Sequence, residues 1–369
     1  MGSITAYATA AGKRFRVRYR KPDHAQTDKR GFRTKRDAEL FLASVEVSKA
    51  RGEFVDATAG RLTVGEIGAD WIRHQDHLKP SSALPLEIAF RLHVSPRWAA
   101  IPVSGVQFSD VQNWVSNIDG GATKVIRAYG VLAAILDVAV RDRRILSNPA
   151  RGVKLPRKTH KEQRYLSHQQ LHDLASASGH HQALILFLGY TGLRWGEAVG
   201  LRVRDIDLVR RRVNVEVNAV EVGGAIVVGT PKTHKRRSVA FPAFLGDELR
   251  KCAQGRDPEA LVFPSVNGDH LRRATRRERS WFTTALSTAG IDAMTVHDLR
   301  HTAASLAISS GANVKAVQRM LGHASAAMTL DVYSSLFDDD LDAVANSLDR
   351  AARELVVGKM WANESSKTS

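Results

Sequence analysis

Six side chains suited to chemistry on a phosphate group occur in the C-terminal half of this 369-residue chain. They fall in three short stretches, at 191–197, 230–237 and 297–333. Arginines bind phosphate oxygens, lysines and histidines move protons, and a tyrosine can act as a nucleophile. Such a set could transfer a phosphoryl group without a metal ion. The six are Arg194, Lys232, His297, Arg300, His323 and Tyr333.

Two of these arginines and the tyrosine form the centre of the hypothesis. Arg194 and Arg300 could bracket one phosphate, because a guanidinium presents a rigid fork of donors to its oxygens. Tyr333 could be the nucleophile, although a phenol with a pKa of about 10 needs help to lose its proton at neutral pH. Any of the three residues taken alone is more often structural, so the prediction depends on their combination.

The remaining candidates move protons. Lys232 follows a proline on a turn and could protonate a leaving oxygen, and Lys235 is a rival for that role three residues later. His297 and His323 can donate or accept a proton near neutral pH.

A zinc site is the main alternative for the histidines. His297 and His301 are four residues apart, as in a zinc-binding helix, but Asp298 stands where such helices carry glutamate. Arg300 would also place a cation beside the metal, and no third ligand is evident. We therefore predict no metal, and the nearby glycines match no nucleotide-binding motif, so we predict no cofactor.

The composition favours a polyanionic partner. The chain has 54 Lys and Arg against 38 Asp and Glu, a formal charge of +16, which favours nucleic acid as that partner. A single cysteine, Cys252, excludes an intrachain disulfide framework and indicates a reducing compartment such as the cytoplasm. No run of about eighteen apolar residues suggests a membrane-spanning helix.

The N-terminal residues 1–56 predict a three-stranded sheet followed by a helix. Residues 15–20 alternate between apolar and arginine side chains, which places the arginines on one face of a strand. Thr34 is a candidate N-cap for the helix. Eleven basic residues lie between positions 13 and 36, so we predict that this module binds DNA. Its candidate contacts are Arg16, Arg18, Arg20, Arg33 and Lys35.

The rest of the chain divides into three further regions. Residues 63–150 have helical periodicity, and residues 165–345 predict a larger α+β domain, with helices resuming near Arg272. Residues 346–369 predict a helix and a polar tail. Basic or small linkers separate the regions, so the fold class is multidomain and mainly α, with small β-sheets.

Further DNA contacts are expected in the α+β domain. Five arginines lie within eight residues from position 272, and at helical spacing they would form a basic face for the phosphate backbone. A solvated helix face explains this cluster about equally well. The candidates are Arg237, Arg272, Arg273, Arg276 and Arg277.

The chain resembles the tyrosine recombinases, specifically phage-type site-specific integrases. The motifs are Thr-Gly-Leu-Arg-x-x-Glu at 191–197, Pro-Lys-Thr with a later arginine at 231–237, His-Asp-Leu-Arg-His at 297–301, Leu-Gly-His at 321–323, and then Tyr333. The resemblance implies an arm-type DNA-binding domain at 1–56, a helical core-binding domain at 63–150 and a catalytic domain at 165–345.

The resemblance also implies a role for each motif residue. Tyr333 would attack a DNA phosphodiester and form a 3′-phosphotyrosine with release of a 5′-hydroxyl. Arg194, Arg300 and His323 would hold the phosphate. The other implied roles are Lys232 as the proton donor to the 5′-oxygen, His297 as an aid to proton transfer at the tyrosine, and Glu197 as a brace for the site.

The implied partners are DNA and other copies of the chain. Four protomers would exchange strands through a Holliday junction at core and arm attachment sites, and residues 340–357 could pack on a neighbour. A host DNA-bending protein and a directionality factor are expected partners, and the host nucleoid is the expected location. No cofactor is implied, because the phosphotyrosine conserves the energy of the broken bond.

Two other functions share the basic charge. A DNA-binding regulator would occupy sites without needing the six-residue constellation. A relaxing topoisomerase of the type IB kind would use the same chemistry, but it would act without sequence preference, and three DNA-contacting regions argue against it.

Overall fold

The computed structural model describes most of the chain, in two compact units, Met1–His160 and Lys161–Ser369. Helices dominate both units and the sheets are small, so the predicted fold class is confirmed. No helix in the described part of the chain is long and apolar enough to cross a membrane. The described residues are 2–22, 24–52, 54–55, 59–158, 164–231, 236–274, 280–333, 348–350 and 352–353.

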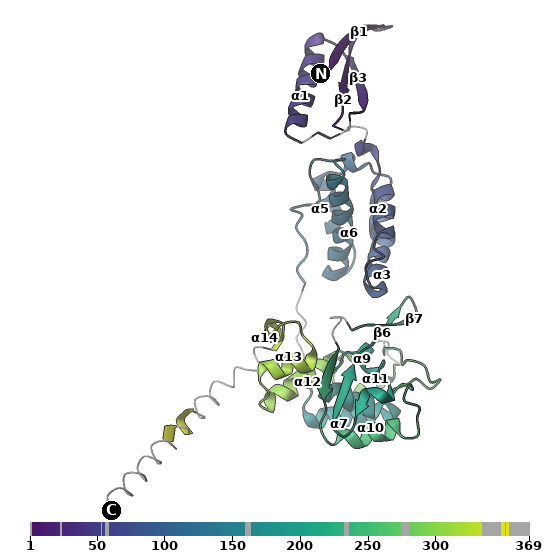
Figure 1. Cartoon of the computed structure of the whole chain (residues 1–369), viewed down its shortest axis with the longest axis vertical. Coiled ribbons are helices and arrows are strands. Elements are labelled where there is room, and N and C mark those ends of the chain that lie inside the picture. The colour runs from purple at the N-terminus through teal and green to yellow at the C-terminus, as the bar shows by residue number, and fades with distance from the viewer. Residues whose placement is uncertain are drawn as a thin grey trace, which may run out of the picture. The chain divides into compact units, whose positions relative to one another are not determined.

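The first unit begins with an antiparallel sheet of three strands in the order β1-β2-β3. One helix, α1, covers a face of this sheet (Figure 1). The strands are β1 (Ser3–Thr9), β2 (Gly12–Arg20) and β3 (Gln26–Phe32), and the helix is α1 (Lys35–Ala50).

The predicted alternation in β2 is confirmed. Val17 is fully buried, and the ring of Tyr19 packs 5.8 Å from that of Phe41 on α1, whereas Arg18 and Arg20 are exposed. Thr34 caps α1 by accepting a hydrogen bond from the backbone N–H of Asp37, as predicted. The sheet therefore turns an apolar face to α1 and presents arginines to solvent.

The helical part of the first unit packs around α6. Eight side chains of this helix are buried, at a spacing that places them on the faces turned to its neighbours. The helix that follows Gln107 begins without a side-chain cap. The helices are α2 (Val64–Arg73), α3 (Pro80–Ala89), α4 (Ser95–Trp98), α5 (Phe108–Ser116) and α6 (Ala122–Arg141), with a π-helical turn at Phe90–Val94.

The second unit is built around the apolar helix α8 (Gln182–Thr191), in which residues 184–189 are all buried. It packs against α7 (His168–Ala177), α12 (Asp298–Ser309) and α10 (Leu245–Ala253). Ser167 and Gln170 form a capping box at the start of α7. The remaining helices are α9 (Trp195–Ala198), α11 (Trp281–Thr288), α13 (Val314–Leu321) and α14 (Ala326–Tyr333).

Two small sheets flank these helices. One has the order β4-β5-β8, and the other is the β6-β7 hairpin, which turns at Gly223 and Gly224. The strands are β4 (Ile206–Asp207), β5 (Arg212–Val215), β6 (Asn218–Val222), β7 (Ala225–Gly229) and β8 (Arg237–Ala240).

The predicted helix near Arg272 is wrong. Arg272 and Arg273 lie in an irregular segment, and α11 begins only at Trp281, where the Ser280 side chain accepts from the Thr283 N–H. Ser280 itself has an extended backbone, so the helix does not continue upstream. Arg276 and Arg277, and most of the predicted C-terminal helix, lie outside the described residues.

Candidate active site

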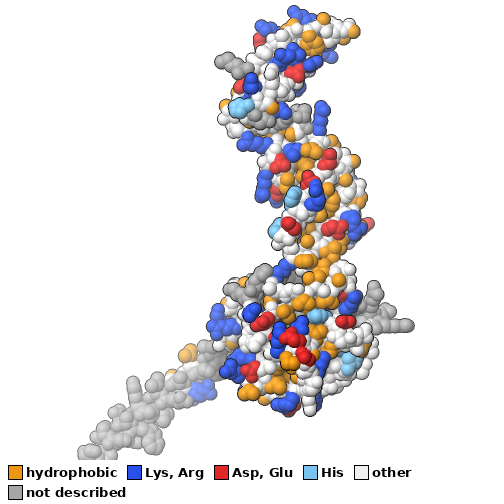
Figure 2. Space-filling view, turned by 45° about the vertical axis from the view of Figure 1, so that its right-hand side comes forward, with side chains coloured by type: hydrophobic (Ala, Val, Ile, Leu, Met, Phe, Trp, Pro, Cys, Tyr) orange, Lys and Arg blue, Asp and Glu red, His pale blue; other side chains and the backbone are white. Residues whose placement is uncertain are grey.

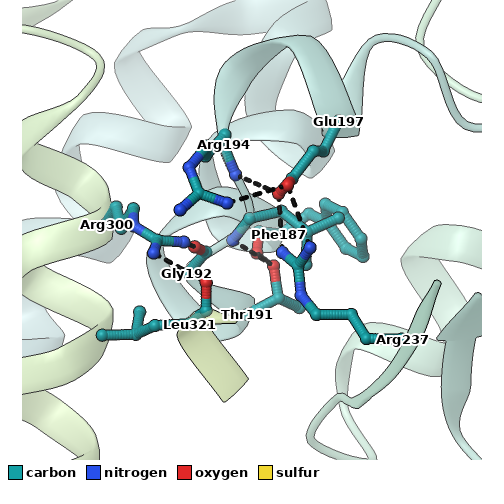
Figure 3. A network of polar contacts seen from close by, with 9 residues as sticks. Phe187, Thr191, Gly192, Arg194, Glu197, Arg237, Arg300 and Leu321 are labelled. Carbon is teal, nitrogen blue, oxygen red and sulfur yellow. Dashed lines mark hydrogen bonds and ion pairs between the residues drawn. The ribbon is translucent and has the colours of Figure 1, made fainter. Parts of the chain in front are cut away.

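A buried carboxylate organises the first motif. Arg194 is the residue before α9, and its Nη1 donates to Glu197 Oε1 at 3.0 Å. Its backbone N–H donates to Oε2 of the same carboxylate at 2.9 Å. Arg237, at the start of β8, donates Nη1 and Nη2 to the two oxygens at 2.9 and 2.6 Å. Figure 3 shows Glu197 between the two guanidinium groups.

This arrangement keeps Glu197 ionised although its side chain is fully buried. Burial alone would raise the pKa of the carboxyl, but the hydrogen bonds and charges of Arg237 and Arg194 outweigh it and hold the pKa below its usual value. The close packing of α9 on β6 requires a glycine at 196, because a Cβ there would lie 2.4 Å from the Ala219 carbonyl oxygen. The motif therefore fixes Arg194 from both its backbone and its side chain.

Arg300 joins the ends of two helices. Its Nη1 donates to the Gly192 carbonyl at 2.6 Å and its Nη2 to the Leu321 carbonyl at 2.7 Å, as Figure 3 shows. The residue is 4% exposed, and burial, together with the charge of Arg194, lowers its pKa to about 9. Gly192 ends α8 with a left-handed φ of +65°, which turns this carbonyl toward the arginine.

His323 follows α13 and Gly322. Its Nδ1 lies 3.0 Å from the Thr329 hydroxyl on α14, and Thr329 is fully buried. Burial lowers the pKa of His323 to about 4, and the charges of Arg300, Arg194 and Arg237 add to the effect. The imidazole is therefore neutral at pH 7 and can donate only one N–H to a bound anion.

Tyr333 is enclosed by apolar side chains of α12 and α13 and is 1% exposed. Its hydroxyl lies 2.8 Å from Nδ1 of His301, and burial raises its pKa to about 12. The sequence analysis weighed His301 only as a zinc ligand and assigned His297 to the tyrosine proton. The pattern that could have identified His301 is its place one turn after His297, on the same helix face.

His297 instead lines a pocket of about 560 Å³ beside α9 and the β6-β7 hairpin. Arg194, which is expected to hold the phosphate, and Arg273, which is expected to contact DNA, line the same pocket. Lys232 and Lys235 lie outside the described residues. No group of three or more metal-binding side chains occurs within the described residues.

Of the other residues expected to contact DNA, some are paired within the protein and others are exposed. Arg237 is held by Glu197, and Arg272 donates to the Gly224 carbonyl at 2.7 Å, on the turn of the β6-β7 hairpin. On the N-terminal sheet, Arg16 is half-buried and 4.0 Å from Asp28, whereas Arg18, Arg20 and Lys35 are exposed and Arg33 follows β3. Figure 2 shows Lys and Arg side chains scattered over the described residues of both units on the visible face.

Comparison with known proteins finds integrases both by sequence and by structure. The profile of the Phage integrase family matches residues 160–339. A prophage phiRv2 integrase of Mycobacterium tuberculosis is 32% identical over 277 residues, which cover 72% of each chain. A Tn1549 transposon integrase solved with a circular intermediate DNA has a TM-score of 0.66 at 22% identity, over 78% of this chain and 99% of that one. A lambda integrase tetramer bound to a Holliday junction has a TM-score of 0.54 at 15% identity, over 87% and 95%.

Proposed function

Because this chain belongs to the phage integrase family of tyrosine recombinases, we propose that it integrates and excises a phage or other mobile element through Tyr333. The protein is a site-specific DNA recombinase, an enzyme that cleaves and rejoins DNA strands by transesterification. The residue roles that follow are part of the proposal.

In the cleavage step the Tyr333 oxygen attacks the scissile phosphorus, a P–O bond to the tyrosine forms, and the bond from phosphorus to the 5′-oxygen breaks. The 5′-oxygen takes a proton from Lys232 or Lys235, and the tyrosine proton passes to a neighbouring base. Arg194, Arg300 and His323 hold the phosphate oxygens and stabilise their charge. Rejoining is the same step in reverse with a different 5′-hydroxyl, so no external energy source is needed.

The observation that carries this assignment is the convergence of Arg194, Arg300 and His323 from three separate motifs. Burial lowers the pKa of both Arg300 and His323, and the charge of Arg194 adds to the effect at each of them, which supports their proximity. Two arginines and a neutral histidine brought together offer several hydrogen-bond donors to an anion, and a DNA phosphate supplies that anion. The Tyr333 hydroxyl lies against His301 and is buried, so the proposal requires that it leave this position before it attacks the phosphorus.

Recombination requires several copies of the protein on DNA. We infer a tetramer that exchanges strands in pairs, and the lambda integrase tetramer on a Holliday junction supports this. The basic sheet at the N-terminus supports a second, arm-type DNA contact on each chain. One chain that holds two distant sites requires bent DNA, so a host bending protein and a directionality factor belong to the proposal. Such a complex would work at the host nucleoid.

The proposal is tested by trapping the covalent intermediate. The protein is incubated with total DNA from its source, the mixture is denatured, and DNA attached to protein is recovered and sequenced. We expect adducts at a few discrete loci for the wild type. The Tyr333→Phe variant should form none, because it lacks the attacking oxygen, while its DNA affinity should stay near that of the wild type.

Each other outcome has a distinct meaning. Adducts scattered over the genome would indicate a relaxing topoisomerase. If binding is intact and no adduct forms even with host extract added, the protein is a regulator and the proposed chemistry is wrong. Equal loss of binding in Tyr333→Phe would make the tyrosine a structural residue.

A further inference from the structure

We propose that Arg237 does not contact DNA. It is a positioning residue that holds Arg194 and His323 in the relative positions that catalysis requires. The inference rests on the proposed function, since it assigns a task within the same site. Arg237 is suited to it because it touches both the motif that carries Arg194 and the motif that carries His323.

The contact toward Arg194 passes through Glu197. Arg237 makes a bidentate ion pair with this carboxylate, and Arg194 shares the same two oxygens through its backbone N–H and its Nη1. A bidentate pair between a planar guanidinium and a carboxylate has one favoured geometry. The position of β8 therefore determines the orientation of the carboxylate, and the carboxylate determines that of Arg194.

The contact toward His323 passes through Gly322. A Cβ built on Gly322 would lie 2.9 Å from Arg237 Nε and 3.0 Å from its Cδ and Cζ, so the Arg237 side chain lies directly against this backbone. Gly322 ends α13 in the left-handed region, at a φ of +66°, and His323 is the next residue. The arginine thus sets how closely β8 and the end of α13 can approach.

The environment of Arg237 argues against a direct role on DNA. Its side chain is 12% exposed, and both Nη atoms are engaged with Glu197. Its Nε is buried and has no hydrogen-bond partner among the described atoms. A phosphate that reached this guanidinium would have to displace a fully buried carboxylate, which would then be left without its main partner.

The adjacent residue Arg236 provides a matched control. Its side chain is 79% exposed and pairs with Glu216 on the surface at 3.3 Å. The test uses the full chain and a nicked duplex of a locus recovered from wild-type adducts. Arg237→Ala should keep the wild-type affinity and salt dependence while its covalent adduct forms about a hundredfold more slowly, because small misplacements of catalytic groups cost that much. Arg237→Lys should restore part of the rate, and Arg236→Ala should cleave at the wild-type rate once bound.

A second pair of variants separates positioning from folding. Gly322→Ala in the wild-type background adds a methyl group that collides with Arg237, and it also strains the backbone. In the Arg237→Ala background the collision is absent and only the strain remains. The loss of cleavage rate caused by Gly322→Ala should therefore be smaller in that background, at equal thermal stability of the paired proteins.

Several results would overturn the inference while leaving the recombinase intact. A salt slope that falls by about 0.9 in Arg237→Ala would show a lost phosphate contact instead. A wild-type cleavage rate in Arg237→Ala would show that it positions nothing. Strictly additive losses for the Gly322 and Arg237 variants would exclude the contact as the cause. Failure of the wild type itself to form an adduct would count against the proposed function.

Discussion

At the scale of single residues, burial holds two histidines of the second unit in their uncharged form. His181 is 7% exposed, and its ring centroid lies 4.1 Å from that of Trp281. Burial, with a smaller contribution from the charge of His180, lowers its pKa to about 4. His323 is shifted to the same value. Both histidines take up a proton more readily in the unfolded chain than in the folded one.

These lowered pKa values predict that the folded protein loses stability as the pH falls. A histidine with a folded pKa of about 4 and an unfolded pKa of about 6.5 contributes its full stability above pH 6.5, and loses it as the pH falls toward 4. We expect the free energy of unfolding to fall by up to about 1.4 kcal/mol per pH unit on account of His181. Guanidinium unfolding followed by Trp fluorescence at several pH values measures this slope.

The variant His181→Gln should flatten the slope, because glutamine does not titrate. The exposed neighbour His180 is the matched control, and His180→Gln should change the slope far less. If His181→Gln keeps the wild-type slope, other groups carry the acid dependence and the buried histidine does not.

At the scale of elements, the active site depends on how the ends of helices meet. Gly192 ends α8, and a Cβ there would lie 2.7 Å from Leu321 Cδ2, at the end of α13. Gly290 has the same φ of +65°, but no atom lies within 4 Å of its Cβ position. The two glycines therefore share the backbone strain of an alanine substitution and differ only in packing.

We expect Gly290→Ala to destabilise the protein by about 1–2 kcal/mol, the cost of a left-handed non-glycine residue. Gly192→Ala should cost about 1–3 kcal/mol more, because Leu321 is fully buried and cannot move aside freely. Denaturant unfolding of the two variants gives both values. Equal costs would mean that the ends of α8 and α13 are less tightly packed than the structure indicates.

Local signals in the sequence predicted the elements better than the site. The cap at Thr34 was predicted because it depends on a partner only three positions away. The helix near Arg272 was wrong because spacing alone cannot show that residues 271–274 form an irregular segment. The role of Arg237 depends on a contact with Glu197, forty residues away, which no local pattern encodes.

The candidate site shows the same difference between local signals and long-range contacts. The motifs identified Arg194, Arg300, His323 and Tyr333, and the structure draws the first three together, while their roles remain predictions. The sequence analysis did not find that His301 lies against the tyrosine hydroxyl, because that contact joins α12 to α14 across thirty-two residues. Residue types can be assigned from motifs, but the partner of a buried hydroxyl is set by tertiary packing.

At the scale of the whole molecule, basic side chains are distributed over both units. Variants of the N-terminal sheet can test whether its basic side chains bind DNA. Arg18 and Arg20 are exposed on β2, whereas Arg30 on β3 is paired with Asp28 at 2.7 Å. If the sheet binds DNA, replacing both Arg18 and Arg20 with alanine should lower the salt slope of arm-site binding by about 1.8, or 0.9 for each lost phosphate contact.

Arg30→Ala is the control, because the charge it removes is already compensated by Asp28. It should leave the slope close to that of the wild type. Binding of each variant to the flanks of a recovered locus, measured between low and physiological salt, gives the slopes. If the double variant binds like the wild type, the sheet is a solvated surface and arm binding resides elsewhere.

The inward position of Tyr333 also concerns the host that carries the gene. If Tyr333 is the nucleophile, a protomer that collides with arbitrary DNA presents no reactive oxygen, because the hydroxyl is enclosed in the protein with 1% of the residue exposed. Breakage of the chromosome then requires the release of α14 as well as contact with DNA. A resident element could therefore keep a standing supply of this protein with fewer strand breaks than an exposed tyrosine would cause.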